Sequence, residues 1–242
     1  MKKPLFTIIV LAYNEEKTIR ECIKSLKKQT SKNFEIMVVN NNSRDRTAEI
    51  AKKEVKNVIL EKRQGYIYAF NAGAKKAKGE FIAAADADSI YPRDWLEKAA
   101  EWIRKKPEIV GVYGSTEFHD ASPIVSFFSN ILFSLFLYFT RLLGQTNTPG
   151  YNFIMRKKVY FDAGGYDPQK YSGIQFDFEL GNRMAKKGSV ILDTSNVVQT
   201  SARRFKKNGY IKTALEYIDG WRRLHYGKKQ KISYAEYNLK AR

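Results

Sequence analysis

The sequence predicts an α/β protein with a mostly parallel central sheet flanked by helices, in a single domain. Short apolar strands alternate with amphipathic helices through the first half of the 242 residues, which is the pattern of a parallel, largely buried sheet. Hydrophobic residues make up 43% of the chain, which is enough for a substantial core. No internal repeat, low-complexity tract or Pro/Gly-rich linker divides it.

In the first half, each of the four predicted strands is followed by a loop and a helix. The first helix is expected to be capped by Asn14 and to run to about Lys28. The fourth is expected to begin at Pro92, because proline is favoured in the first helical turn, and to run to about Lys105. The strands are predicted at Phe6–Leu11, Glu35–Val39, Val58–Leu60 and Phe81–Ala85, and the second and third helices at Asp45–Glu54 and Tyr66–Lys78.

The second half is less regular, and its elements are predicted from apolar runs and helical spacing. Strands are expected at Val110–Glu117, Tyr151–Arg156 and Ser189–Leu192, and helices at Pro123–Leu143, Asp177–Lys187 and Lys212–His225.

Polar residues follow three of the predicted strands, around Tyr13, Asn41 and Asp88. In a right-handed parallel sheet these loops converge at the carboxyl edge, where open α/β sheets bind ligands. The triplet Asp86-Ala87-Asp88 ends a buried strand, so alternation places both carboxylates on one face. Carboxylate oxygens together with substrate phosphates are typical ligands of Mg²⁺. The triplet therefore predicts a metal site, although the same pattern also occurs in solvated turns.

The charge balance predicts attraction to polyanions. The chain has 43 Lys and Arg against 25 Asp and Glu, a formal net charge of +18, and this favours nucleic acid, anionic lipid or phosphorylated small molecules equally. Cys22 is the single cysteine, which excludes a disulfide framework or a Cys-based zinc cluster within the chain. No cleavable leader is recognised, so the cytoplasmic side is expected.

The loop after the first strand excludes two common nucleotide-binding classes. It carries no G-x-G-x-x-G, and the chain has no Walker A motif, so a nicotinamide enzyme or a P-loop ATPase is not expected. A nucleotide could still bind with its base between the first two loops and its phosphates on a metal at Asp88.

Seven ordered motifs resemble those of family 2 glycosyltransferases, which are inverting enzymes with the GT-A fold. The resemblance covers residues 5 to 200. The motifs are Ile8–Glu16, Val38–Thr47, Asn71–Gly73, Ala77–Glu80, Asp86–Asp88, Gly164–Asp167, and Asp177–Leu180 followed by Arg183.

The resemblance implies a GT-A catalytic domain over residues 1–202, with a nucleotide-sugar half (1–110) and an acceptor half (111–202). It implies that Asp88 binds Mg²⁺ or Mn²⁺ and that Asp177 is the general base that deprotonates the acceptor. The residues it assigns to the nucleotide or the donor sugar are Ala12, Tyr13, Glu15, Asn41 and Asp86.

The chain departs from the family pattern at three positions. The base-contact loop usually carries Asp but here has Asn40-Asn41-Asn42, which leaves UDP- and GDP-linked donors both open. Phe176 replaces the acid that often precedes the catalytic Asp. The family's Q-x-x-R-W element is echoed by Gln199 and by Arg203-Arg204-Phe205, whose arginines either clamp the diphosphate or form a solvated basic surface.

Two further segments bear on membrane contact. Residues 121–140 are uncharged and long enough to span a bilayer, but small polar residues recur along one face, so a packed, an interfacial and a transmembrane helix all stay open. The segment 203–242 is predicted to be helical, basic and aromatic-rich, with ten Lys or Arg between Arg203 and Lys231. Basic residues of this kind hold a protein at an anionic membrane or form a solvated surface.

The predicted function is therefore transfer of a sugar from a nucleotide-sugar donor to a hydroxyl or phosphate acceptor. A glycan or lipid-linked acceptor is expected, with peripheral contact at the inner face of the membrane. Nucleic acid is not an expected partner. The alternatives are a sugar nucleotidyltransferase, whose Gly-rich basic loop is missing after the first strand, and a non-catalytic polyanion or membrane-surface binder, whose binding would collapse with salt.

Overall fold

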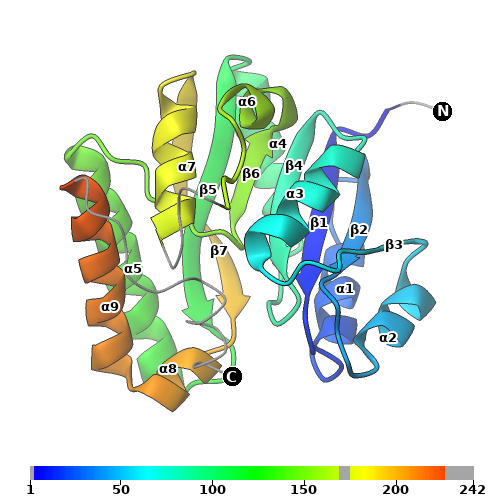
Figure 1. Cartoon of the computed structure of the whole chain (residues 1–242). Coiled ribbons are helices and arrows are strands. Elements are labelled where there is room, and N and C mark those ends of the chain that lie inside the picture. Colours follow the sequence, from blue (N-terminus) through cyan, green and yellow to red (C-terminus); the bar gives the residue numbers. More distant parts are fainter. Residues whose placement is uncertain (1–2, 169–174, 227–242) are drawn as a thin grey trace.

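The computed structural model describes residues 3–168 and 175–226 and contains a seven-stranded sheet in the order β3-β2-β1-β4-β6-β5-β7 (Figure 1). Neighbouring strands are parallel except on either side of β6, which runs antiparallel to β4 and β5. This confirms the predicted mostly parallel sheet. The strands are β1 (Phe6–Ala12), β2 (Phe34–Asn40), β3 (Asn57–Leu60), β4 (Phe81–Asp86), β5 (Ile109–Phe118), β6 (Phe153–Arg156) and β7 (Ser189–Thr200).

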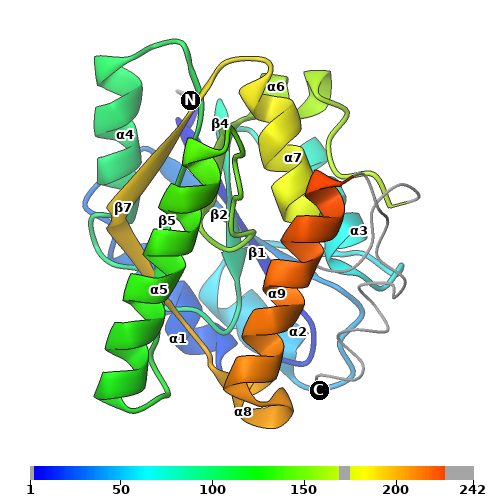
Figure 2. The same ribbon diagram turned by 90° about the vertical axis from the view of Figure 1, so that its left-hand side faces the viewer.

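Helices cover both faces of the sheet (Figures 1 and 2). On one face pack α1 (Ile19–Lys27), α2 (Thr47–Glu54) and α4 (Trp95–Lys105), and on the other α3 (Tyr66–Lys76), α5 (Pro123–Leu142), α6 (Lys157–Asp162) and α7 (Gln175–Ala185). Two further helices, α8 (Arg203–Asn208) and α9 (Tyr210–His225), follow the last strand.

The apolar side chains of β1 supply both hydrophobic cores. Ile8 and Val10 point into the core beneath α1, α2 and α4, while Ile9 and Leu11 point into the core beneath α3 and α7. All four side chains are buried, as expected for a strand whose two faces are both covered by helices.

Several predicted boundaries are wrong. Asn14 does not cap α1: it has a φ of +55° and its Oδ1 accepts a hydrogen bond from the backbone N–H of Arg44, and the helix begins four residues after Glu15, at Ile19. Pro92 lies ahead of α4, which begins at Trp95. Strand β7 continues to Thr200, well beyond the predicted Leu192.

The C-terminal segment is only partly described. Residues 203–226 form α8 and α9, as the helical prediction expected, and residues 227–242 of the predicted basic segment lie outside the described residues. Helix α9 is held against the chain after α5, because Trp221 Nε1 donates a hydrogen bond to Gln145 Oε1 at 2.5 Å.

Helix α5 packs on the sheet through a face that combines small polar side chains with the buried Leu137. Ser134 Oγ lies 2.6 Å from Ser115 Oγ on β5, Asn130 donates a hydrogen bond to the Thr116 carbonyl, and Ser126 Oγ accepts one from the Phe118 backbone N–H. The opposite face is apolar and exposed. Among the described residues α5 alone is long and apolar enough to span a membrane, and 11% of its most apolar window is buried.

Candidate active site

The first two strand-end loops lie side by side at the carboxyl edge of the sheet. In the strand register Ala12 lies beside Asn40 and Leu11 lies beside Asp86. The Asn41 backbone N–H donates a hydrogen bond to the Ala12 carbonyl at 2.8 Å, which joins the first two loops directly. The convergence predicted from the strand–helix alternation is therefore confirmed.

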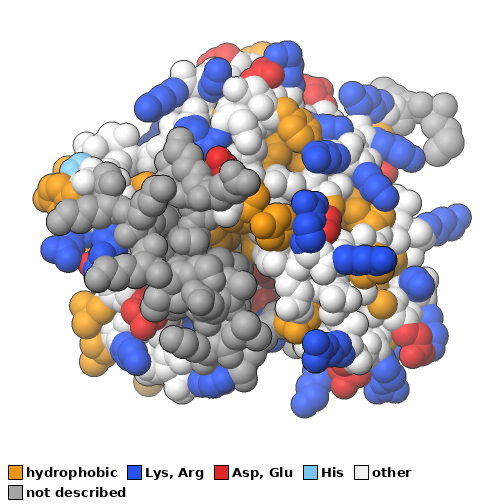
Figure 3. Space-filling view, viewed as in Figure 1, with side chains coloured by type: hydrophobic (Ala, Val, Ile, Leu, Met, Phe, Trp, Pro, Cys, Tyr) orange, Lys and Arg blue, Asp and Glu red, His pale blue; other side chains and the backbone are white. Residues whose placement is uncertain are grey.

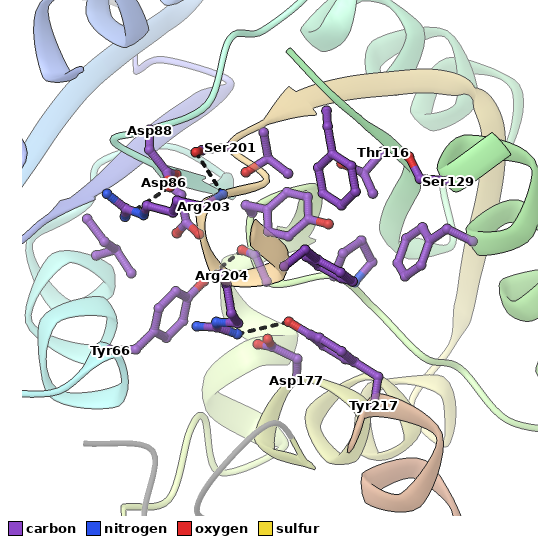
Figure 4. A pocket seen from close by; sticks show the side chains of 18 of the residues that line it. Tyr66, Asp86, Asp88, Thr116, Ser129, Asp177, Ser201, Arg203, Arg204 and Tyr217 are labelled. Atoms are coloured by element: carbon purple, nitrogen blue, oxygen red, sulfur yellow. Dashed lines mark hydrogen bonds and ion pairs between the residues drawn. The ribbon is translucent and has the colours of Figure 1, made fainter. Parts of the chain in front are cut away.

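Arg203 connects the carboxylates at this edge. Its guanidinium lies 2.9 Å from Asp88 Oδ2 and donates a hydrogen bond of 2.9 Å to Glu15 Oε2 (Figure 4). The side chains of Glu15 and Asp88 are 5% and 11% exposed, whereas that of Arg203 is 44% exposed, so the carboxylates are buried and the guanidinium is open to the cavity. Helix α8, which sequence reasoning did not predict as a separate element, places Arg203 here.

Burial raises the pKa values of Asp86 and Asp88, and for Asp86 the neighbouring charge of Asp88 raises it further. Such a cluster of carboxylates favours an additional cation, because opposite charge stabilises their ionised forms. Oxygen donors match Mg²⁺ or Mn²⁺. No group of three or more acidic, His or Cys side chains arranged for a metal occurs in the described part of the chain, and a metal at Asp88 stays a prediction.

Asn41 lies in the wall of the site, and its side-chain amide holds the loop before α3. The amide nitrogen donates to the carbonyls of Glu61 and Arg63, and Oδ1 accepts the Gly65 N–H at 2.7 Å. These bonds shape the loop that leads to Gly65, where φ is +134°. The structure thus shows a loop-ordering contact for Asn41, and the predicted contact with a nucleotide base stays a prediction.

Asp177 lies in the first turn of α7 and faces the same cavity (Figure 4). Its Oδ1 accepts a hydrogen bond of 2.6 Å from the Tyr166 hydroxyl. Desolvation raises the pKa of Asp177 to about 7, although hydrogen bonds from Tyr166 and from the Gly150 backbone oppose the shift. A carboxyl group with a pKa near neutrality is suited to general base catalysis.

Gly150 leaves room for this carboxylate. A Cβ at position 150 would lie 2.6 Å from Asp177 Oδ2 and 2.8 Å from the Tyr66 hydroxyl, so a larger residue there would displace one of these two side chains. The Gly150 carbonyl accepts a hydrogen bond from that same hydroxyl at 2.7 Å. Tyr66 and Gly150 therefore fix the loop that borders Asp177.

Arg204 is a second basic residue of the cavity, and it lies beside Asp177. Its Nη1 donates a hydrogen bond to the Tyr217 hydroxyl of α9 at 2.9 Å, and Figure 4 shows the guanidinium beside Asp177. The positive charge lowers the pKa of Asp177, against the stronger effect of burial.

One continuous cavity of about 840 Å³ joins these groups. All nine side chains predicted for the site line it, although they come from both halves of the chain. They are Ala12, Tyr13, Glu15, Asn41, Asp86, Asp88, Asp177, Arg203 and Arg204.

Comparisons with known proteins agree with this geometry. The family described as Glycosyl transferase family 2 matches residues 7–162, which is more than half of the chain. The chain belongs to glycosyltransferase family 2.

Two relatives illustrate the range of this family. The chain is 34% identical over 125 residues to the putative glycosyltransferase EpsH of Bacillus subtilis, a match that covers 50% of this chain and 36% of EpsH. It is 27% identical over 242 aligned positions to a dolichyl N-acetyl-alpha-D-glucosaminyl phosphate 3-beta-D-2,3-diacetamido-2,3-dideoxy-beta-D-glucuronosyltransferase of Methanococcus voltae, covering 87% of this chain and 71% of that protein. EpsH and the next matches are aligned over about a third of their own length.

Solved structures of GT-A glycosyltransferases confirm the GT-A fold. The mannosyltransferase PcManGT of Pyrobaculum calidifontis, in complex with GDP-Man and Mn²⁺, superposes with a TM-score of 0.64 at 19% identity, covering 90% of this chain and 65% of that one. Residues 1–349 of TarS of S. aureus, in complex with UDP-GlcNAc, give a TM-score of 0.64 at 21% identity, covering 81% and 58%. The predicted family and fold are thus confirmed.

Sequence reasoning missed three residues that shape the family 2 site in this chain. They are Tyr66, Gly150 and Tyr166, which contact one another or Asp177. The sequence offers a weak signal for two of them: Gly65 directly precedes a helix, and Pro149-Gly150 is a typical turn dipeptide shortly before a strand. The pairing of Tyr166 with Asp177 had no local signal, because the Gly164–Asp167 motif suggests a turn.

Proposed function

We propose that the chain is a metal-dependent inverting glycosyltransferase that transfers a sugar from a UDP- or GDP-linked donor to a hydroxyl or phosphate acceptor. The observation that carries this proposal is a single cavity with a carboxylate–arginine cluster at one side and Asp177, with a pKa of about 7, at the other. The carboxylate–arginine cluster is suited to binding the donor, and Asp177 is suited to removing a proton from the acceptor. Because both line one cavity, they can act on a donor and an acceptor bound next to each other.

The donor is assigned to the strand-end loops in residues 1–110. Ala12, Tyr13, Glu15 and Asn41 border the base and ribose, and Asp86 contacts the ribose or the donor sugar. Support comes from the position of these side chains around one cavity and from the complexes of the similar structures with GDP-Man and with UDP-GlcNAc.

Asp88 would hold a divalent ion, Mg²⁺ or Mn²⁺, against the donor diphosphate. When bound, such an ion neutralises the negative charge that develops on the leaving phosphates. Arg203 adds positive charge beside Asp88, and Arg204, which lines the same cavity, adds it beside Asp177. Arg203 stabilises the leaving diphosphate from α8 through a guanidinium whose position is fixed by Glu15.

Asp177 acts on the acceptor, which occupies the half formed by residues 111–202. It removes the proton from the acceptor oxygen while that oxygen forms its bond to the anomeric carbon. The bond between the anomeric carbon and the diphosphate oxygen breaks, and its electron pair leaves with the nucleoside diphosphate. One displacement of this kind inverts the anomeric centre without a covalent sugar–enzyme intermediate.

The acceptor is lipid-linked or membrane-proximal, and the protein lies peripherally at the inner, cytoplasmic face of the membrane. Support comes from α5, whose polar side chains bond to β5 while its apolar side chains, Leu135 (58% exposed) and Leu142 (69% exposed) among them, face outward. A helix with an outward apolar face gains free energy from burial in a bilayer interface. Figure 3 shows hydrophobic side chains at the edge where Figure 1 places α5 and α9.

A thermal-shift panel of UDP- and GDP-sugars, with Mn²⁺, with Mg²⁺ and with a chelator, tests the enzymatic proposal. Selective binding raises the unfolding temperature, because a ligand that binds the folded state stabilises it. We expect one donor to raise it by several degrees in the presence of the metal and to lose most of this effect with the chelator. If no nucleotide sugar stabilises the protein, the proposal fails.

Membrane contact predicts that the protein co-floats with anionic liposomes at low salt. Replacing Leu135, which is exposed on the outer face of α5, by glutamine should lower the membrane partition coefficient about 30-fold, because a buried leucine contributes about 2 kcal/mol. The matched control is Leu60→Gln: Leu60 is equally exposed (56%) but lies on β3 at the far edge of the sheet. Failure to co-float, or an equal loss with both variants, would contradict the proposed membrane face.

A further inference from the structure

The active-site cavity extends into an apolar groove between α5 and α9, which the proposed chemistry does not use. We call it the α5–α9 groove. Its walls carry Ile124, Phe128 and Leu132 from α5, and Ile211, Ala214 and Ile218 from α9. Figure 2 shows α5 and α9 running next to each other with a gap between them. Residues of both helices line the cavity that contains Asp177.

The groove walls are apolar and open to the surroundings. Leu132 is 66% exposed and Ile211 is 79% exposed, whereas residues of this kind are normally buried in a soluble protein. The apolar walls are continuous with the outward face of α5, so the exposed area is much larger than a single side chain. Contiguous exposed apolar surface of this extent marks a binding site.

At its inner end the groove changes from apolar to charged. Tyr217 lines both the groove and the active site, and its hydroxyl accepts the hydrogen bond from Arg204. Asp177 lies beside Arg204 (Figure 4). A ligand that matches this sequence of surfaces has a hydrocarbon chain, then an anionic group, then the oxygen that accepts the sugar.

We propose that the α5–α9 groove binds the hydrocarbon chain of a lipid phosphate acceptor drawn from the membrane, with the phosphate at Arg204 and the protonated phosphate oxygen that accepts the sugar at Asp177. The proposal rests on the proposed function and specifies its acceptor class. A protein partner or a second copy seated in the groove would close the cavity over Asp177, so a chain that enters and leaves with the substrate fits the site better.

Basic side chains are exposed along the two C-terminal helices. They are Lys206 and Lys207 on α8, Lys212 near the start of α9 and Arg222 in its last turn. Their charge complements a membrane rich in anionic lipid, which would be the source of the acceptor. The same charges also attract free phosphate, so the length of the hydrocarbon chain has to be the variable that is tested.

The test is calorimetric binding of inorganic phosphate, geranyl phosphate and farnesyl phosphate to the full chain, below the concentration at which these esters form micelles. Each added isoprene unit buries more apolar surface in the groove. We expect farnesyl phosphate to bind at least tenfold tighter than geranyl phosphate, and inorganic phosphate to bind weakest.

Two neighbouring tryptophan substitutions locate the chain. Ala214 is exposed and lines the groove, so Ala214→Trp should fill it and remove the dependence of affinity on chain length. Leu215 is exposed on α9 outside the groove, so Leu215→Trp should keep the full dependence. Circular dichroism and the unfolding temperature of both variants show that each folds.

Three results would overturn the proposal. The first is equal affinity of the wild-type protein for the two prenyl phosphates. The second is an equal loss of chain-length dependence in both variants. The third is a concentration-dependent dimer that Ala214→Trp abolishes, since a second copy would then cover the groove. Donor stabilisation in the nucleotide-sugar panel, measured separately, distinguishes these outcomes from failure of the proposed glycosyl transfer.

Discussion

Replacing Asp177 by asparagine is expected to lower the rate of sugar transfer by about 10²- to 10⁴-fold, the usual contribution of a general base. Donor affinity should stay within about twofold, because the strand-end loops and Asp88 are untouched. Asparagine keeps an Oδ1 that can accept the hydrogen bond from the Tyr166 hydroxyl, so the local geometry is preserved. Single-turnover transfer with a labelled donor measures the rate, and calorimetry measures donor binding.

The control for this substitution is Asp162→Asn on α6. Asp162 is a partly exposed acid paired with Lys158, away from the cavity, so its loss should leave transfer unchanged. Transfer by Asp177→Asn at more than a tenth of the wild-type rate would exclude Asp177 as the base. The base would then have to be another group, because donor binding alone does not remove the acceptor proton.

The pH dependence of the same step follows from the environment of Asp177. The base acts when ionised, and desolvation raises its pKa to about 7, so the rate should rise with pH through about 7 and level off above it. Tyr166→Phe removes a hydrogen bond that lowers the pKa of this carboxyl. The midpoint of the profile should therefore move to higher pH in Tyr166→Phe, a shift that a purely structural role of Tyr166 would not produce.

The parallel half of the fold and the donor-side cluster were predictable because the information is local. Apolar runs such as Phe81–Asp86 mark buried strands, and polar residues directly after them mark the carboxyl edge. The carboxyl ends of parallel strands joined by right-handed crossovers lie at one edge of the sheet, so the loops at residues 12, 41 and 88 were expected to converge there. The ordered motifs located Asp177, which no periodicity would have distinguished from other helical acids.

The positions that fix Asp177 could not be predicted, because they depend on contacts between distant segments. Tyr66 and Gly150 are 84 residues apart in the sequence, and their hydrogen bond forms only when α3 packs beside the loop before β6. The close approach of Asp177 and Tyr66 to Gly150, which a larger side chain would disturb, also arises from the fold. Neither contact leaves a pattern within either segment.

Helix α5 shows a different limit of sequence reasoning. Its polar and apolar faces were visible, and a packed, an interfacial or a transmembrane helix could each have produced them. Hydrophobic burial would place the apolar face on the sheet, but Ser115 and Thr116 on β5 offer hydrogen-bonding partners that the polar face satisfies. The orientation of the helix thus depends on polar residues of another element, and it leaves most of the apolar face exposed.

Replacing Asp88 by asparagine is expected to abolish metal-dependent binding of the nucleotide sugar. The carboxylate is the metal ligand in the proposed site, and a neutral amide oxygen attracts a divalent cation much less. In the wild-type protein the Arg203 guanidinium lies 2.9 Å from this carboxylate, so an arriving cation must share Asp88 with Arg203 or displace it toward Glu15. The variant keeps the Glu15 partner of Arg203 and should fold normally.

Two measurements separate a metal ligand from a structural ion pair at Asp88. Donor binding to wild type should weaken at least 100-fold with a chelator, whereas binding to Asp88→Asn should be weak with or without metal. The exposed surface acid Asp94, which pairs with Lys98, provides the matched control, and Asp94→Asn should keep the full metal effect. If Asp88→Asn retained the wild-type response to Mn²⁺, the ion would lie elsewhere, and the Arg203 pair would be the sole function of this carboxylate.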